Sequence, residues 1–127
     1  MDNKLLIEKA KEAMKNAYVP YSKFKVGAAI VCKDGSVYTG CNIENATYGA
    51  TICAERTAIF KAVSEGKRDF EKIAVVSDIP ATFPCGICRQ VMAEFMPDGV
   101  VLVEDKDNEI KVFKVNELIP HAFTLES

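Results

Sequence analysis

Three cysteines in the middle of the chain could bind a metal ion. Cys85 and Cys88 form a C-x-x-C pair, which is typical of half a zinc site or of a redox dithiol and also occurs by chance. Cys53 begins another predicted helix. Catalytic zinc usually keeps three protein ligands and one open position for water, whereas structural zinc closes all four positions. Three cysteines therefore favour a catalytic zinc ion, one per chain.

Two more cysteines, Cys32 and Cys41, are candidates for a fourth ligand, since both lie on or beside a predicted pair of strands. A buried, inert thiol that packs as a small hydrophobic residue is the commoner role, and we expect it for both. The redox interpretation stays open, because the C-x-x-C pair opens a predicted helix, as a thioredoxin-like dithiol would.

Glu55 and Arg56 follow Cys53 closely. A carboxylate beside a zinc-bound water can take its proton and pass it to a substrate. Helix periodicity does not by itself place Glu55 at the metal, because two residues turn an α-helix by about 200°. Taken alone, Glu55 fits a solvent-exposed acid in a first helical turn better than a catalytic group. Arg56 fits a solvent-exposed helix residue as well as it fits a metal-site residue.

The charge of a three-thiolate site supports a role for Arg56. Zinc with three thiolates carries a net negative charge, and a bound hydroxide would add another. This negative charge makes the zinc-bound water less acidic. Both cysteine clusters lie at predicted helix N-termini, each equivalent to about half a positive charge. The Arg56 guanidinium, one turn after Cys53, can donate to a thiolate and withdraw charge from it.

Helices and strands must position these residues, and their patterns alternate along the chain. An apolar stripe at helical spacing comprises Leu5, Leu6, Ala10, Ala13, Met14 and Ala17. We expect helices at residues 3–17, 52–65 and 86–95, a helical turn at 116–119, and strands at 25–32, 36–41, 72–77, 100–104 and 110–115. Helices alternating with apolar strands predict an α/β fold, a three-layer α/β/α sandwich with both sheet faces covered.

Cap and turn residues mark the ends of these elements. Asp2 or Asn3 can cap the first helix. Asp34-Gly35 predicts a tight turn between the first two strands. Thr51 is the expected N-cap of the second helix, and Gly66 lies just past its expected end.

The composition is that of an ordinary globular protein. The chain has 127 residues, of which 49% are hydrophobic and 27% charged, which fits a single domain over residues 1–127. Sixteen basic residues against eighteen acidic ones give a net charge of −2, which argues against nucleic acid as a partner. No apolar run approaches about 18 residues, so we expect no membrane span. The N-terminus lacks the apolar core of a signal peptide, and we therefore expect a cytoplasmic location.

Other common sites are missing from the sequence. The glycines form neither a dinucleotide fingerprint nor a P-loop. The only histidine is His121, near the C-terminus, so any dense metal site must be built from cysteine. No role follows from the sequence for Arg89 or Gln90.

The combined motifs resemble the small, homotetrameric cytidine deaminases, a branch of the zinc-dependent cytidine and deoxycytidylate deaminases. The resemblance covers residues 18–123. It is carried by Pro20–Phe24, Val26–Ala29, Asn42–Ala46, Cys53–Ala62 and Pro84–Gln90. It implies a five-stranded mixed sheet and an enzyme of pyrimidine salvage that converts cytidine, and 2′-deoxycytidine as well, to the uracil nucleoside and ammonia.

The resemblance also implies the roles of the catalytic residues. Cys53, Cys85 and Cys88 would bind zinc, and zinc hydroxide would attack C4 of the cytosine ring. Glu55 would carry protons from the zinc-bound water to ring N3 and then to the departing amine. Arg56 would temper the thiolate charge.

The nucleoside would be bound by residues near the metal. Phe24 would pack against the base, and the backbone N–H of Ala54 would hold the pyrimidine carbonyl. Asn42 and Glu44 would bind the ribose hydroxyls, so the site should reject free cytosine. Without the resemblance, Phe24 would be read as a core residue and the other two side chains as solvated loop residues.

In this family a neighbouring subunit completes the pocket. Tyr48 would approach the ribose from that subunit, and Phe123 would stack on the base, which is worth about 1–3 kcal/mol. The chain departs from many relatives at Ile87, which replaces a small residue, and in its short tail after Phe123.

Two alternatives compete with this interpretation. The nearest is a deaminase of another aminopyrimidine nucleoside such as blasticidin S, because those enzymes share the Cys-Ala-Glu and Pro-Cys-x-x-Cys motifs. The second is a structural zinc or redox module without turnover, which would predict a closed four-cysteine site or a reversible dithiol.

Overall fold

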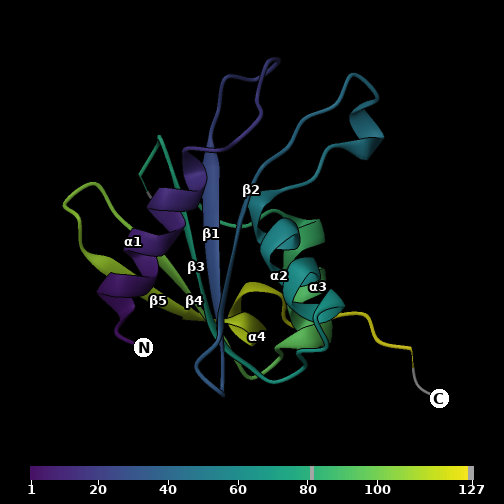
Figure 1. Cartoon of the computed structure of the whole chain (residues 1–127). Helices are drawn as coiled ribbons and strands as arrows, with labels where there is room; N and C mark the ends of the chain where they lie inside the picture. The colour runs from purple at the N-terminus through teal and green to yellow at the C-terminus, as the bar shows by residue number, and fades with distance from the viewer. Residues whose placement is uncertain (81, 126–127) are drawn as a thin grey trace.

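The structure of the protein is a computed structural model that describes residues 1–80 and 82–125. In these residues it has five strands and four α-helices. The helices are α1 (Asn3–Met14), α2 (Ala54–Ser64), α3 (Gly86–Phe95) and α4 (Val115–Leu118), with a 3₁₀ turn at Tyr48–Ala50. The strands are β1 (Val26–Cys32), β2 (Val37–Cys41), β3 (Phe70–Ser77), β4 (Val100–Glu104) and β5 (Ile110–Lys114). Figure 1 shows their arrangement.

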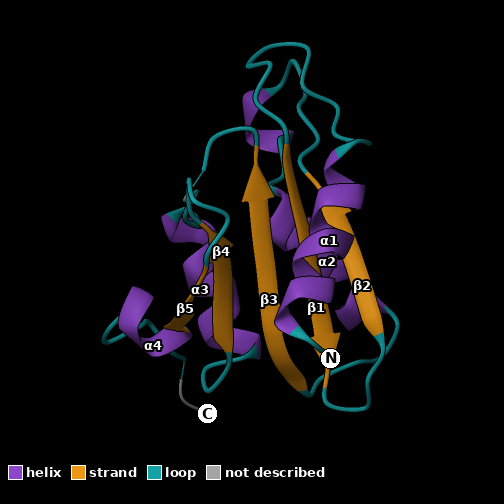
Figure 2. Ribbon diagram, turned by 90° about the vertical axis from the view of Figure 1, so that its left-hand side faces the viewer, coloured by secondary structure: helices purple, strands orange, loops and turns teal. Residues whose placement is uncertain are grey.

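The strands form one mixed sheet in the order β2-β1-β3-β4-β5 (Figure 2). Only β3 and β4 run parallel, with Lys72 opposite Val100, and the other neighbouring strands are antiparallel. The expected five-stranded mixed sheet is confirmed.

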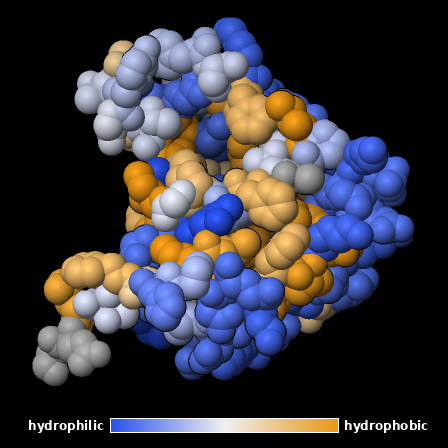
Figure 3. Space-filling view, turned by 180° about the vertical axis from the view of Figure 1, so that it is seen from behind, coloured by the Kyte–Doolittle hydropathy of each residue, from blue (hydrophilic) through white to orange (hydrophobic). Residues whose placement is uncertain are grey.

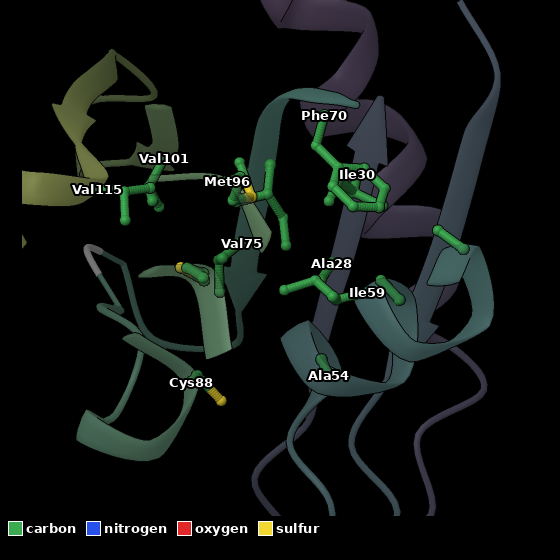
Figure 4. Packing of buried hydrophobic residues seen from close by; sticks show 14 of the residues in the cluster. Ala28, Ile30, Ala54, Ile59, Phe70, Val75, Cys88, Met96, Val101 and Val115 are labelled. Atoms are coloured by element: carbon green, nitrogen blue, oxygen red, sulfur yellow. The ribbon is translucent and has the colours of Figure 1, made fainter. Parts of the chain in front are cut away.

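Helices cover both faces of the sheet, which confirms the three-layer sandwich (Figures 1 and 2). On one face α1 buries Leu6, Ile7 and Ala10 against the inner strands. On the other face α2 and α3 pack over a larger core, in which Ile59 (Figure 4) and Met92 are fully buried. The two helices that carry the cysteines therefore stand side by side on one apolar layer.

The ends of α1 and α2 differ from the prediction. The helix α1 ends at Met14, before residue 17, because the following N–H groups bond three residues back in tight turns. Leu5 is 48% exposed, and its place on the buried stripe is taken by Ile7. Thr51 does not cap α2: Ile52 pairs with Ile43 and keeps the chain extended until Cys53, which is the N-cap.

Other predicted ends are confirmed. Asp2 caps α1 by accepting from the Lys4 N–H at 3.4 Å. Gly66 follows α2 with a φ of +91°, and its N–H donates to the Val63 carbonyl, a usual C-terminal glycine geometry. The helix α3 and the strand β4 have the predicted bounds.

Gly40 allows α2 to approach the sheet closely. A Cβ atom at this position would lie 2.5 Å from the Ala58 nitrogen and 2.7 Å from the Ala54 carbonyl oxygen. Since Ala54 begins α2, this contact sets the height of the helix N-terminus above β2. In the described residues, no helix is long and apolar enough to cross a membrane.

Candidate active site

The sulfur atoms of Cys53, Cys85 and Cys88 meet where α2 and α3 begin. Cys53 is the N-cap of α2, Cys85 is the N-cap of α3, and Cys88 lies in the first turn of α3. The three sulfur atoms lie within 4.8 Å of one another. The Cys88 side chain points toward the start of α2 (Figure 4). Two helix N-termini therefore direct their partial positive charge at one cluster of thiols.

The spacing of the sulfurs fits a tetrahedral zinc ion. The Cys53 and Cys85 Sγ atoms are 3.8 Å apart. Zn–S bonds of about 2.3 Å at tetrahedral angles place two sulfurs about 3.8 Å apart. Within the described residues, Cys32 and Cys41 lie outside this group, and Cys32 is buried in the core as expected. The cluster thus offers three protein ligands and leaves one coordination position for water.

The protonation of the thiols also points to a cation. A hydrogen bond from the Cys88 thiol is the largest cause that lowers the pKa of Cys53 to about 5, and Arg56 and Cys85 add to it. The same hydrogen bond, followed by burial, raises the pKa of the Cys88 thiol. Three thiolates at this spacing repel one another, so a bound metal ion is what would allow all three to ionise together.

Arg56 lies against the first ligand. Its Nη2 atom donates to the Cys53 Sγ atom at 3.4 Å, and the side chain is partly buried. Its Nε atom is buried without a hydrogen-bond partner in the described structure. A solvent-exposed helix arginine would show neither feature. The guanidinium is therefore placed to withdraw charge from a thiolate.

Glu55 is the one charged residue in the described core, with 4% of its surface exposed. Burial, and to a lesser extent the charge of Cys53, raise the pKa of its carboxyl to about 7. A carboxyl with this pKa can both accept and donate a proton near neutral pH. The interpretation of Glu55 as a solvent-exposed helix residue is therefore wrong.

Two loops extend beyond the sheet above this cluster, residues 18–24 and residues 42–52 (Figure 1). They are joined through Tyr18, whose N–H donates to the Asn42 carbonyl at 3.0 Å and whose carbonyl accepts from the Glu44 N–H at 2.8 Å. Figure 3 shows a hollow beneath the projecting lobe that the second loop forms, with hydrophobic residues around it.

The side chains of Asn42 and Glu44 hold the neighbouring loop. The Asn42 amide donates to the Phe24 carbonyl at 2.7 Å and accepts from the Val26 N–H at 2.9 Å. The Glu44 carboxylate accepts from the N–H groups of Tyr21 at 2.9 Å and Ser22 at 3.1 Å, and from the Ser22 hydroxyl. These bonds, the Ser22 hydroxyl first, lower the pKa of Glu44. Each side chain therefore has a structural task in addition to its expected contact with ribose.

Tyr48 and Phe123 are both largely exposed. Tyr48 is 79% exposed and packs edge-on to Tyr21, with ring centroids 6.4 Å apart. Phe123 is 67% exposed, and its backbone carbonyl accepts from the Gln90 amide at 2.9 Å. Both rings are therefore available to another molecule.

Arg89 is a site residue that the sequence did not reveal. Its Nε atom donates to the Pro84 carbonyl at 2.8 Å, and its Nη1 atom donates to the Leu118 carbonyl at 3.0 Å. The side chain therefore ties the residue before Cys85 to the end of α4. The arginine after Cys88 was visible in the sequence, but its two carbonyl partners, one of them 29 residues away, were not.

Comparison with known proteins agrees with this geometry. A family model described as the cytidine and deoxycytidylate deaminase zinc-binding region matches residues 1–104. The chain belongs to this family of zinc-binding deaminases.

Full-length relatives make the similarity more specific. The chain is 56% identical to the cytidine deaminase of Halalkalibacterium halodurans, an alignment that covers 99% of this chain and 97% of the relative. The crystal structure of the cytidine deaminase of Burkholderia pseudomallei superposes with a TM-score of 0.91 at 48% identity, over 97% of this chain and 100% of that one. A blasticidin-S deaminase of Bacillus cereus is 38% identical, over 94% of this chain and 90% of its own.

Proposed function

We propose that this chain is a zinc-dependent cytidine deaminase, which hydrolyses cytidine to uridine and ammonia. The observation that carries this conclusion is the cluster of Cys53, Cys85 and Cys88 beside a buried carboxyl, Glu55, whose pKa is about 7. The 56% identical relative and the solved structure from Burkholderia pseudomallei are both named cytidine deaminases, and each is matched along nearly its whole length.

Cys53, Cys85 and Cys88 would hold one zinc ion per chain, which when bound lowers the pKa of a water so that it can attack C4 of the ring. Glu55 accepts the proton of that water and delivers it to ring N3. It then carries the second proton to the amine, which leaves as ammonia while the C4 carbonyl forms. Its raised pKa supports both transfers. Arg56 offsets the charge of Cys53 through its hydrogen bond.

The nucleoside would lie between the cysteine cluster and the two loops. In this proposal Phe24 packs against the base and the Ala54 N–H holds the pyrimidine carbonyl, since the first N–H groups of a helix have no partner within it. Asn42 and Glu44 bind the ribose hydroxyls. After its two loop bonds the Asn42 amide keeps one N–H and one lone pair, which leaves capacity for a sugar hydroxyl.

We further propose that the enzyme is a homotetramer in which neighbouring subunits share active sites. Tyr48 and Phe123 would reach the ribose and the base of an adjacent subunit, and their large exposed surfaces support this assignment. The cytoplasmic location and the activity on 2′-deoxycytidine stay predictions from the sequence.

The blasticidin-S deaminase relative supports a second candidate substrate, since the chain is 38% identical to it. The higher identity to the cytidine deaminase of Halalkalibacterium halodurans, 56%, favours cytidine. A non-catalytic zinc or redox module is disfavoured by Glu55, because a buried carboxyl beside three thiols destabilises a purely structural site.

A side-by-side rate panel tests the proposal. Loss of ultraviolet absorbance and release of ammonia would be followed for cytidine, 2′-deoxycytidine, cytosine, dCMP and blasticidin S at equal concentrations. Cytidine should be among the fastest substrates, and cytosine should be far slower. Zinc-loaded protein that turns over none of these compounds would point to the structural module.

A further inference from the structure

The hydroxyl group of Ser22 joins two of the proposed substrate residues. It donates to one carboxylate oxygen of Glu44 and accepts from the backbone N–H of Phe24 at 3.0 Å. A serine hydroxyl can make both bonds at once, because it has one proton and two lone pairs. The backbone N–H of Ser22 donates to the second oxygen of Glu44 at 3.1 Å.

The other side of Phe24 is held in the same way. Its carbonyl accepts from the Asn42 amide at 2.7 Å, and the Asn42 oxygen accepts from the Val26 N–H at 2.9 Å. The Phe24 N–H therefore bonds to the Ser22 hydroxyl, which in turn bonds to Glu44, and the Phe24 carbonyl bonds to Asn42. The residue for the base and the two residues for the sugar form one hydrogen-bonded unit.

Lys23 lies inside this unit in an unusual conformation. Its φ of +62° is in the left-handed region, which is disfavoured for a residue with a side chain. Such a conformation persists only where the surrounding contacts impose it. The Lys23 N–H donates to the Val19 carbonyl at 3.1 Å, and the Ser22 hydroxyl spans from the Phe24 N–H to Glu44. The loop is thus a tight turn in which the Ser22 hydroxyl bridges the Phe24 N–H and the Glu44 carboxylate.

We propose that Ser22 is a positioning residue that fixes Phe24 relative to Glu44, so that the base and the sugar of one nucleoside are recognised together. This inference rests on the proposed function, because it requires Phe24 and Glu44 to contact the nucleoside. Removal of the hydroxyl leaves the Phe24 N–H without its partner and the Glu44 carboxylate with one donor fewer. Binding of the whole nucleoside weakens, whereas the chemistry at the cysteine cluster is unaffected.

Ser22→Ala tests the proposal, with Ser36→Ala as the matched control. The Ser36 hydroxyl also donates to a carboxylate, Asp34 Oδ1, at 2.6 Å, and its N–H donates to the same atom at 2.9 Å. It lies in the β1–β2 turn at the opposite end of the sheet from the loops (Figure 1). Both variants would be compared with the zinc-loaded wild type for cytidine and cytosine.

Ser22→Ala should raise the KM for cytidine about tenfold with little change in kcat, since one hydrogen bond to a charged group is lost. The inhibition constant of uridine, which has the sugar but no amine to lose, should rise by the same factor. The slow rate with cytosine should fall much less, because cytosine lacks the sugar that Glu44 is proposed to bind. Ser22→Thr keeps the hydroxyl and should restore most of the loss, and Ser36→Ala should match the wild type.

Three results would overturn the proposal. The first is a Ser22→Ala variant whose KM and kcat equal those of Ser36→Ala. The second is a fall in kcat without a rise in KM, and the third is an equal loss of kcat/KM for cytidine and cytosine. A double-mutant cycle with Glu44→Gln adds an independent check, because the Ser22→Ala effect should shrink in that background, and full additivity contradicts the coupling. A wild type that does not deaminate cytidine would instead refute the proposed function.

Discussion

The cysteine cluster and the two substrate loops are held in place by different forces. The cluster sits on the ends of two helices that pack on the core, and both Ala54 and Cys88 are fully buried. The loops of residues 18–24 and 42–52 are largely exposed and are held by hydrogen bonds from side chains to distant backbone groups. The candidate metal site is thus fixed by packing, and the proposed substrate pocket is fixed by a small polar network.

This difference separates the tasks of the two regions. A metal site needs its ligands within a fraction of an ångström, which rigid helix ends provide. A pocket on loops can change its sugar contacts without disturbing the ligands. Substitutions in the cluster should therefore alter kcat or metal binding, whereas substitutions in the loops should alter KM and selectivity.

The largest effect is expected for Glu55→Gln. The amide keeps the volume of the side chain but cannot carry a proton, so kcat for cytidine should fall by at least about 10³. The zinc content should stay that of the wild type, as measured by metal analysis. Retained activity would show that another group moves the protons.

Asn42→Ala and Glu44→Ala should come next. Each removes a proposed sugar contact and also releases one side of Phe24 or the turn at Ser22. The kcat/KM for cytidine should fall by about 10- to 100-fold, and that for cytosine much less. Steady-state kinetics with both substrates gives the comparison. Equal losses for the two would refute the sugar contacts.

Arg89→Ala should weaken metal retention more than catalysis. Without the guanidinium the Pro84 carbonyl is free and the loop before Cys85 loosens. Zinc transfer to a coloured chelator should be about tenfold faster. Arg68→Ala is the matched control, because Arg68 also donates to two backbone carbonyls, those of Val63 and Lys67, both at 2.8 Å. If both variants release zinc at the same rate, Arg89 has no special role.

The smallest effect concerns packing beneath the cluster. Gly40→Ala forces α2 away from β2 and should lower the free energy of unfolding by about 1–3 kcal/mol. A Cβ atom at Gly49, in the exposed loop, would have no atom within 4 Å. Gly49→Ala should therefore change the free energy of unfolding by less than about 0.5 kcal/mol. Denaturant titrations of the two variants compare the regions directly, and similar losses would contradict the difference drawn between them.

The sequence predicted best what depends on local pattern. The order of helices and strands, the bounds of α3 and the turn at Gly66 follow from periodicity and from glycine chemistry. The helix α2 begins at Ala54, two residues later than predicted, because Ile52 pairs with Ile43 and stays extended. This pairing joins two separate segments of the chain. Local propensity does not contain such contacts.

The candidate site divides in the same way. The three cysteines were recognisable from residue type and spacing, but the burial of Glu55 was not, because it depends on how α2 rests on the sheet. The tasks of Ser22 and Arg89 were missed, since their partners lie 22 and 29 residues away in the sequence. Polar side chains of this kind look like ordinary surface residues until the fold is known.

In the proposed mechanism, three cysteine sulfurs hold one zinc ion with an open position for catalysis. The most direct test is to remove zinc from the protein with a chelator and add it back in steps while cytidine turnover is measured. Activity should disappear with the metal, return when zinc is added, and saturate at about one zinc per chain. Undiminished turnover by metal-free protein, or no turnover by fully loaded protein, would contradict it.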